Sequence, residues 1–167
     1  MLRTVRYIRT VVVSSVILAS AACGGDGGAN PSNIGESIPA LGTLRATVDG
    51  ATKEFVVTAA TDSLTNLVVI GGEDSPLTTF VALQTQAAVG TKSVPDTDVV
   101  AAYAGSETWE SGGWAAYGPN GSGTITIKSI NSTSITGTFS FTMVAFGTAS
   151  GTKVIANGSF NAPLFSN

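Results

Sequence analysis

Two carboxylates and four aromatic side chains lie close together in one stretch of this 167-residue chain. The set comprises Glu107, Glu110, Tyr103, Trp109, Trp114 and Tyr117. A glycosidase needs two carboxylates about 5 to 9.5 Å apart across a sugar, and aromatic faces can stack on sugar rings. This stretch predicts either a carbohydrate site on a loop, or solvated loop charges beside rings that cap the core.

Other acidic pairs could offer oxygen ligands to calcium. The candidates are Asp96-Thr97-Asp98 and Glu73-Asp74. A calcium site needs about six to eight oxygens, and neither run resembles the twelve-residue calcium-binding loop of an EF-hand. We therefore expect acids that solubilise strand ends, with calcium as the alternative, and we expect no resident metal or cofactor.

The chain contains no histidine and a single cysteine, Cys23. Without histidine, Ser-His-Asp and Cys-His nucleophile systems cannot form within one chain. A lone cysteine also excludes internal disulfides and cysteine-based zinc clusters. These absences favour a protein that is not an enzyme.

The residues before Cys23 have the order of a secretory signal peptide. Three arginines come first, followed by an apolar run over residues 11–18 and small residues at positions 19–22. The apolar run is shorter than the roughly 20 residues that a membrane-spanning helix needs. This order fits an ordinary signal peptide, in which Cys23 is incidental or a buried free thiol. The alternative follows from the residues around Cys23.

The segment Leu18-Ala19-Ser20-Ala21-Ala22-Cys23-Gly24-Gly25 resembles the lipobox of bacterial lipoproteins, although Ser20 stands where leucine is usual. The resemblance implies that Cys23 receives a diacylglycerol, that cleavage occurs before it, and that the new amino terminus is acylated with a fatty acid such as palmitate. It also implies a lipid-anchored protein of the cell envelope. Gly24 resembles the residue after the cysteine in lipoproteins sorted to the outer membrane, on its periplasmic face or at the cell surface.

Composition divides the chain into three parts. We expect residues 1–22 to be the signal peptide, residues 23–42 a lipidated cysteine with a flexible Gly- and Asn-rich linker, and residues 43–167 an all-β domain. Removing residues 1–22 removes three arginines and no acid, which leaves 5 basic and 11 acidic side chains. Such an acidic protein has no basic footprint for nucleic acid. The expected partners are the membrane, through the anchor, and a glycan or an envelope protein, with the chain itself a monomer.

From residue 43 onward, apolar residues recur at every second position. This alternation is typical of strands with one buried face. Expected strands include residues 44–48, 54–57, 67–70, 79–83, 99–103, 123–128, 135–144 and 153–162, whereas residues 71–76 have the composition of a loop. About nine strands joined by short turns predict an antiparallel β-sandwich or flattened barrel.

The hairpin between Gly123 and Val144 is the strongest of these patterns. Isoleucines alternate with threonines up to a turn at Asn131-Ser132-Thr133, and the chain returns with phenylalanines on one face and hydroxyl side chains on the other. So long an alternation predicts a strand with one wet face.

Five short patterns within residues 43–164 resemble a family of uncharacterised bacterial envelope lipoproteins, catalogued as a domain of unknown function. They are Leu44-Arg45-Ala46-Thr47-Val48-Asp49-Gly50, Val89-Gly90-Thr91, Gly123-Thr124-Ile125-Thr126-Ile127, Thr136-Gly137-Thr138-Phe139-Ser140-Phe141 and Asn157-Gly158-Ser159-Phe160. After Gly50 the chain has Ala51-Thr52 where members often have an aromatic residue. The resemblance implies a β-sandwich-like fold and an envelope location, and it implies no reaction, ligand or catalytic residue.

Overall fold

Ten β-strands form the part of the chain that the computed structural model describes, residues 38–76, 78–105 and 111–166. They are β1 (Thr43–Val48), β2 (Ala51–Asp62), β3 (Leu67–Asp74), β4 (Thr79–Gln86), β5 (Gly90–Val94), β6 (Val100–Gly105), β7 (Gly112–Tyr117), β8 (Ser122–Ile130), β9 (Ser134–Gly147) and β10 (Thr152–Ser166). The all-β prediction is confirmed. The predicted site residues Cys23, Glu107, Trp109 and Glu110 lie outside the described residues.

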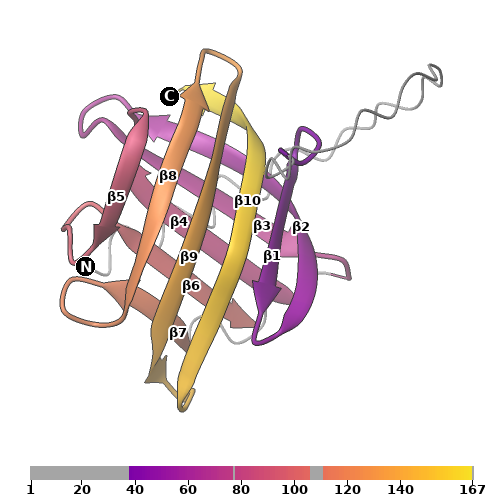
Figure 1. The fold of residues 1–167 in the computed structure, drawn as a ribbon, viewed down its shortest axis with the longest axis vertical. Coiled ribbons are helices and arrows are strands. Elements are labelled where there is room, and N and C mark those ends of the chain that lie inside the picture. Colours follow the sequence, from indigo (N-terminus) through magenta and orange to yellow (C-terminus); the bar gives the residue numbers. More distant parts are fainter. Residues whose placement is uncertain (1–37, 77, 106–110, 167) are drawn as a thin grey trace, which may run out of the picture. The chain divides into compact units, whose positions relative to one another are not determined.

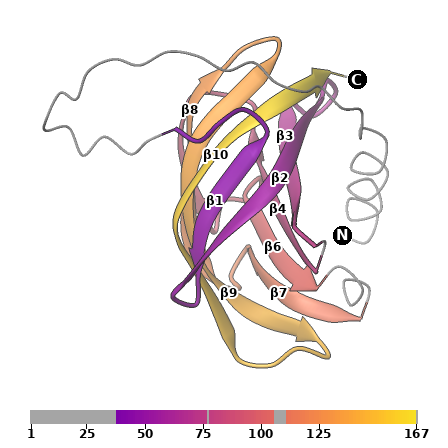
Figure 2. The same cartoon turned by 90° about the vertical axis from the view of Figure 1, so that its right-hand side faces the viewer.

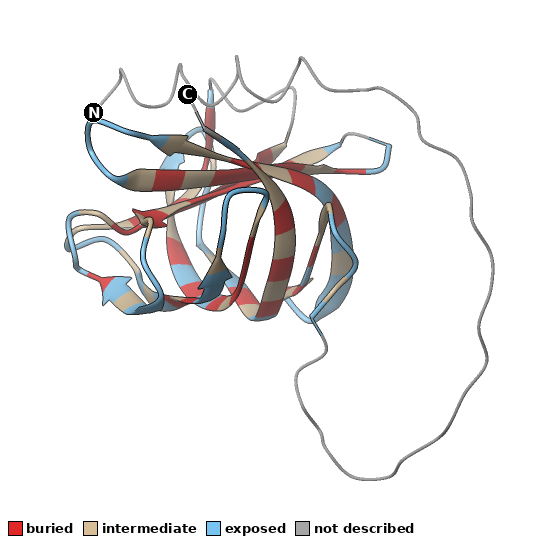
Figure 3. Ribbon diagram, turned by 90° about the horizontal axis from the view of Figure 1, so that it is seen from above, coloured by how far each residue is buried: buried red, intermediate tan, exposed pale blue. Residues whose placement is uncertain are grey.

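The strands form two layers that face each other. In Figure 1 the front layer runs β5-β8-β9-β10-β1, and the rear layer runs β2-β3-β4-β6-β7. Figure 2 shows the two layers from the side. Seen from above in Figure 3, buried stripes alternate with exposed ones along the strands, as period-two side chains require when one face is covered.

Hydrogen bonds join the two layers, so the sandwich is also a flattened barrel. The long strand β9 pairs with β8 up to Thr142 and then with β7 from Val144, while β10 lies along its other side. On the opposite side, β1 pairs with both β10 and β2. Beyond the start of β1, Leu164–Ser166 pair directly with Ala59–Thr61 in parallel, an exception to the expected antiparallel arrangement. We call this junction of β1, β2 and β10 the seam.

Strand β5 is the exception to this closure. Among the described strands it alone has one neighbour, β8, to which it is antiparallel.

The core between the layers is aromatic and aliphatic. Its largest fully buried side chains include Phe55, Phe141 and Phe160, contributed by β2, β9 and β10. The ring centroids of Phe139 and Phe160 lie 6.2 Å apart, within the usual range for paired aromatic rings.

Two glycines explain the repeated Gly-x-Phe pattern of β9 and β10. Gly137 lies opposite Phe160, and Gly158 lies opposite Phe139. A Cβ on Gly137 would stand 2.6 Å from the Phe160 ring, and one on Gly158 would stand 2.6 Å from the Phe139 ring. Each ring therefore covers the glycine on the opposite strand, and the two Gly-Phe pairs fix the register of β9 against β10.

Three local predictions were wrong. Residues 71–74, predicted as loop, form the end of β3, and residues 112–117, predicted as loop, form β7. Strand β5 was not expected at all. Small residues account for the errors in β3 and β7, because Gly71-Gly72 and Gly112-Gly113 hide the alternation although the backbone there is buried.

Candidate functional site

Charged and aromatic side chains gather where the β1–β2, β3–β4 and β9–β10 connections lie. Asp74, the last residue of β3, is buried in this region. Its Oδ1 accepts hydrogen bonds from the backbone N–H groups of Thr78 and Thr79 at 2.8 and 2.7 Å. Both threonine hydroxyls donate to the same carboxylate. The Asp74 carboxylate therefore links the end of β3 to Thr78 and to Thr79, the first residue of β4.

Lys53 of β2 neutralises this buried carboxylate. Its Nζ donates to Asp74 Oδ2 at 3.1 Å and lies 3.5 Å from the Thr79 hydroxyl oxygen. We call Lys53, Asp74, Thr78 and Thr79 the Lys53–Asp74 network. It ties three neighbouring strands of the rear layer together at their ends.

The network shifts both ionisable groups toward their charged forms. Burial acts to raise the pKa of Asp74, but the hydrogen bonds from Thr79, Lys53 and Thr78 outweigh it and hold the pKa well below its usual range. Burial acts to lower the pKa of Lys53, but the hydrogen bond to Asp74, with contributions from Tyr103, outweighs it and raises the pKa. The pair is ionised near neutral pH.

A second group surrounds Lys153, the second residue of β10. Its Nζ lies 4.2 Å from the centre of the Trp114 ring and 5.6 Å from that of Tyr103. It also donates to Asp49 Oδ2 at 2.8 Å. We call Asp49, Tyr103, Trp114 and Lys153 the Lys153 cluster. A cation over a ring face is attracted by the ring quadrupole, so the cluster combines an ion pair with cation–π contacts.

The turn between β1 and β2 positions Asp49. Asp49 and Gly50 both have positive φ, at 46° and 87°, as a tight two-residue hairpin turn requires. Asp49 Oδ1 also accepts from the N–H of Val154 at 2.9 Å. The hydrogen bonds from Lys153 and Val154 lower the pKa of Asp49 against a smaller opposing effect of burial.

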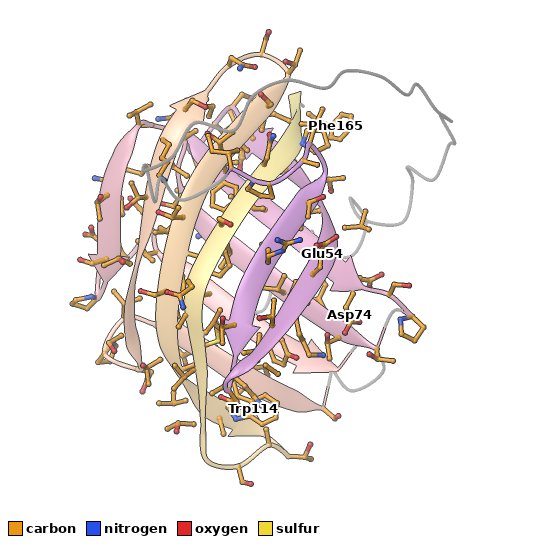
Figure 4. The ribbon with its side chains drawn as sticks, turned by 45° about the vertical axis from the view of Figure 1, so that its right-hand side comes forward. Glu54, Asp74, Trp114 and Phe165 are labelled. Atoms are coloured by element: carbon orange, nitrogen blue, oxygen red, sulfur yellow. The ribbon has the colours of Figure 1, made fainter. Side chains whose placement is uncertain are left out.

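The predicted aromatic residues are placed on two faces. Tyr103 and Trp114 lie directly opposite each other on β6 and β7, with ring centroids 6.4 Å apart. Tyr103 is buried in the core, and the Trp114 indole N–H donates to the carbonyl of Ser150 at 3.2 Å. Tyr117 lies three residues along β7 from Trp114 and so on its other face, half-buried. Figure 4 shows Trp114 near the ends of β9 and β10.

The acidic runs considered for calcium do not converge in the described residues. Glu73 and Asp74 are adjacent on β3 and therefore point to opposite faces. Asp98 accepts a hydrogen bond from the Gln86 amide at 2.8 Å. Across residues 38–76, 78–105 and 111–166, no three His, Cys, Asp or Glu side chains stand close enough to hold a metal ion.

The ion pairs of this region were not anticipated from the sequence. Lys53, Asp74 and Lys153 occur in the same phase as the buried residues Phe55, Ile70 and Ile155. A charged residue in the buried phase at a strand end is the signal that could have found them, because it must be paired.

The structure contains no helix long and apolar enough to span a membrane within the segments that it describes. Comparison with known proteins found no matching family model, no matching curated protein and no matching solved structure. The resemblance to envelope lipoproteins therefore stays a prediction.

Proposed function

We propose that this chain is a lipid-anchored bacterial envelope protein, attached through Cys23, whose all-β domain is a non-enzymatic binding or structural module. The observation that carries the proposal is the position of Cys23, directly after an arginine-containing segment, an apolar run and four small residues. Two or three acyl chains on this residue would give stable attachment.

The position of Cys23 in the sequence supports this proposal, because it lies before the unit that the structure describes. Among the described residues the core is built from aliphatic and aromatic side chains, and the described unit begins at Ile38, 15 residues after Cys23. An unpaired thiol in an oxidising compartment is a liability unless it is modified. Acylation accounts for a lone cysteine in such a compartment.

The charges of the two clusters favour a structural role over acid–base catalysis. Asp74 is held ionised by a depressed pKa, so it is a poor proton donor near neutral pH. Lys53 and Lys153 are each paired with a carboxylate, at 3.1 and 2.8 Å. Both clusters join connections between strands, as groups that stabilise the end of a sandwich would.

The alternative is a carbohydrate-binding or carbohydrate-active protein that uses the Trp109 and Trp114 region. Of the two tryptophans, only Trp114 lies in the described residues, and Lys153 already stands over its ring at 4.2 Å. A sugar that stacks on this face would have to displace the ammonium group. Because Lys153 occupies this face of the Trp114 ring, we favour the non-enzymatic module over the carbohydrate alternative.

The anchor is tested by expressing the full chain in a bacterium and fractionating the cells. We expect mass spectrometry to find a diacylglycerol-modified Cys23 at the amino terminus of the mature protein. The Cys23→Ala variant should be released in soluble form or remain as an uncleaved precursor. Membrane-bound Cys23→Ala protein of mature size would contradict the proposal.

The binding role is tested by thermal unfolding of the detergent-solubilised protein with calcium, EDTA and a panel of envelope and plant polysaccharides. A ligand at 100 times its dissociation constant adds about 2.7 kcal/mol of stability. A shift with one glycan that Trp114→Ala abolishes would favour the carbohydrate alternative. A shift that persists in Trp114→Ala would place the binding surface elsewhere on the module.

A further inference from the structure

Exposed apolar side chains gather at the seam. Figure 4 shows Phe165 at the end of β10, far from Trp114 at the opposite end of the sandwich. The exposed residues there are Leu41 (62%), Val56 (75%) and Phe165 (46%). We call these three residues the seam patch. Large apolar residues exposed to this degree mark interaction surfaces when they lie together.

Strand register places Val56 and Phe165 on one outer surface. Gly42 donates to the Asn161 carbonyl of β10 and accepts from the Val57 N–H of β2, so Gly42 lies between these two strands, and the exposed Leu41 directly precedes it. Phe165 pairs with Ala60, which lies on the same face of β2 as Val56. The neighbouring Leu164 packs against the core, so Phe165 points outward.

Acidic side chains border this apolar surface along β2. The outer row of the strand reads Glu54, Val56, Thr58, Ala60 and Asp62. Arg45 neutralises Glu54 at 2.8 Å, and Asp62 accepts a hydrogen bond from the N–H of Leu64. An apolar stretch with a polar border fits a surface that contacts an apolar phase over a limited area.

The seam patch also lies where the chain from Cys23 joins the domain. Leu41 belongs to the patch, and Cys23 precedes Ile38, the first described residue, by 15 residues. Fifteen residues reach at most about 50 Å. A lipid on Cys23 would thus keep the start of the domain within about 50 Å of the bilayer.

We propose that the seam patch docks onto the lipid bilayer that holds the anchor, with Leu41, Val56 and Phe165 at the boundary of headgroups and acyl chains. This inference rests on the proposed lipidation of Cys23 and adds a second, non-covalent contact with the same membrane. Docking would orient the domain with the Lys153 cluster away from the lipid.

A matched pair of valine substitutions tests the orientation. Val56 lies in the seam patch, and Val154 is an exposed residue of β10 beside the Lys153 cluster, 44% exposed. Because acylation consumes the thiol of Cys23, Val56→Cys and Val154→Cys each present one free thiol for an environment-sensitive fluorophore. The full lipidated protein is reconstituted into phosphatidylethanolamine–phosphatidylglycerol vesicles that contain a lipid with a nitroxide quencher on its acyl chain.

We expect the label at position 56 to lose most of its emission and the label at position 154 to keep its emission. Equal emission at the two positions, with Cys23 shown by mass spectrometry to be lipidated, would overturn docking and leave the anchor intact. Disulfide-linked dimers of unlabelled Val56→Cys protein, with no quenching in the labelled protein, would overturn it in favour of a second copy on the patch. An unmodified Cys23 would overturn both proposals.

A polar variant gives an independent check. Val56→Ser with Phe165→Ser replaces exposed side chains and should leave the fold intact. With a fluorophore on Leu41→Cys, this variant should show less quenching than the same label on the otherwise natural sequence. Unchanged quenching would contradict a contact made by the patch.

Discussion

At the scale of single residues, the Lys53–Asp74 network joins a buried carboxylate to a partly buried ammonium group. Asp74→Ala would leave Lys53 partly buried without its partner and would free the N–H groups of Thr78 and Thr79. Removing one partner of a buried ion pair costs about 3 to 5 kcal/mol. We expect a loss of about 3 kcal/mol in the free energy of unfolding, measured by urea denaturation.

The exposed Arg45–Glu54 pair is the matched control for this prediction. Its two side chains are 60% and 57% exposed, against 10% for Asp74. Exposed ion pairs contribute little because water screens them. Glu54→Gln should leave the urea midpoint unchanged, and an equal loss in both variants would show that burial does not set the strength of these pairs.

The lowered pKa of Asp74 also predicts how stability changes with pH. A carboxylate with a folded-state pKa below its unfolded value of 3.8 contributes stability that is present above that value. This contribution is lost as the pH falls through the folded-state pKa. The free energy of unfolding of the natural protein should therefore fall steadily below about pH 4. The Asp74→Asn variant should have a lower free energy of unfolding at neutral pH and should lose less of it on acidification. Parallel unfolding midpoints for the two proteins between neutral and acidic pH would contradict this linkage.

Lys153 has a separate and smaller role. Lys153→Met keeps an apolar stem but removes the ammonium group over Trp114 and leaves the half-exposed Asp49 without its partner. A partly exposed cation–π contact contributes about 1 kcal/mol. We expect a loss of about 1 kcal/mol together with a change in tryptophan emission. A stability loss as large as that of Asp74→Ala would mean that Lys153 contributes as much to stability as the Lys53–Asp74 network does.

At the scale of elements, the β9–β10 pair depends on its two cross-strand Gly-Phe contacts. Gly137→Ala would press a methyl group against the Thr126 carbonyl oxygen of β8 and place it 2.6 Å from the Phe160 ring, and Gly158→Ala would place one 2.6 Å from the Phe139 ring. Overpacking of this kind costs about 1 to 3 kcal/mol. Both variants should unfold at lower urea concentration. Gly151→Ala is the control, because it is strained by its positive φ of 73° but meets no neighbour. Amide exchange along β9 and β10 should rise in Gly137→Ala and Gly158→Ala but not in Gly151→Ala.

The sequence predicted some elements better than others for a physical reason. The hairpin of β8 and β9 was predicted because Ile125, Phe139 and Phe141 alternate with hydroxyl side chains that face solvent. Strand β7 was missed because both of its faces are covered. Buried glycine and alanine residues therefore occupy both faces, and the sequence shows no alternation of apolar and polar residues. Period-two reasoning works where one face is wet and fails where small residues are buried on both faces.

The candidate site was harder to predict than the fold. Tyr103 and Trp114 are close in sequence, and the structure does bring them together. Their partners Asp49 and Lys153 are 104 residues apart, and only the pairing of β1 with β10 makes them neighbours. Sequence alternation shows that Lys153 is on an inward phase, but it does not reveal which strand lies opposite.

At the scale of the whole molecule, the carboxyl end of β10 closes the barrel against β2. Truncation after Pro163 would remove the parallel pairing with Ala59–Thr61 and the core contact of Leu164. We expect amide exchange of residues 59–61 to rise sharply while β8 stays protected. Uniformly faster exchange throughout the domain would show that the seam is needed for the whole fold and not for local closure alone.

Strand β5, which alone among the described strands has one neighbour, would matter if Cys23 is lipidated. Molecules confined to a membrane meet often, and an exposed strand edge can pair with a strand of a neighbouring molecule. Here the strand with one partner, β5, is only five residues long, includes Lys92 and is followed directly by Pro95. A short charged edge that ends in proline is a poor template for chain-to-chain pairing. The architecture thus resists polymerisation under the crowded conditions that lipid anchoring would create.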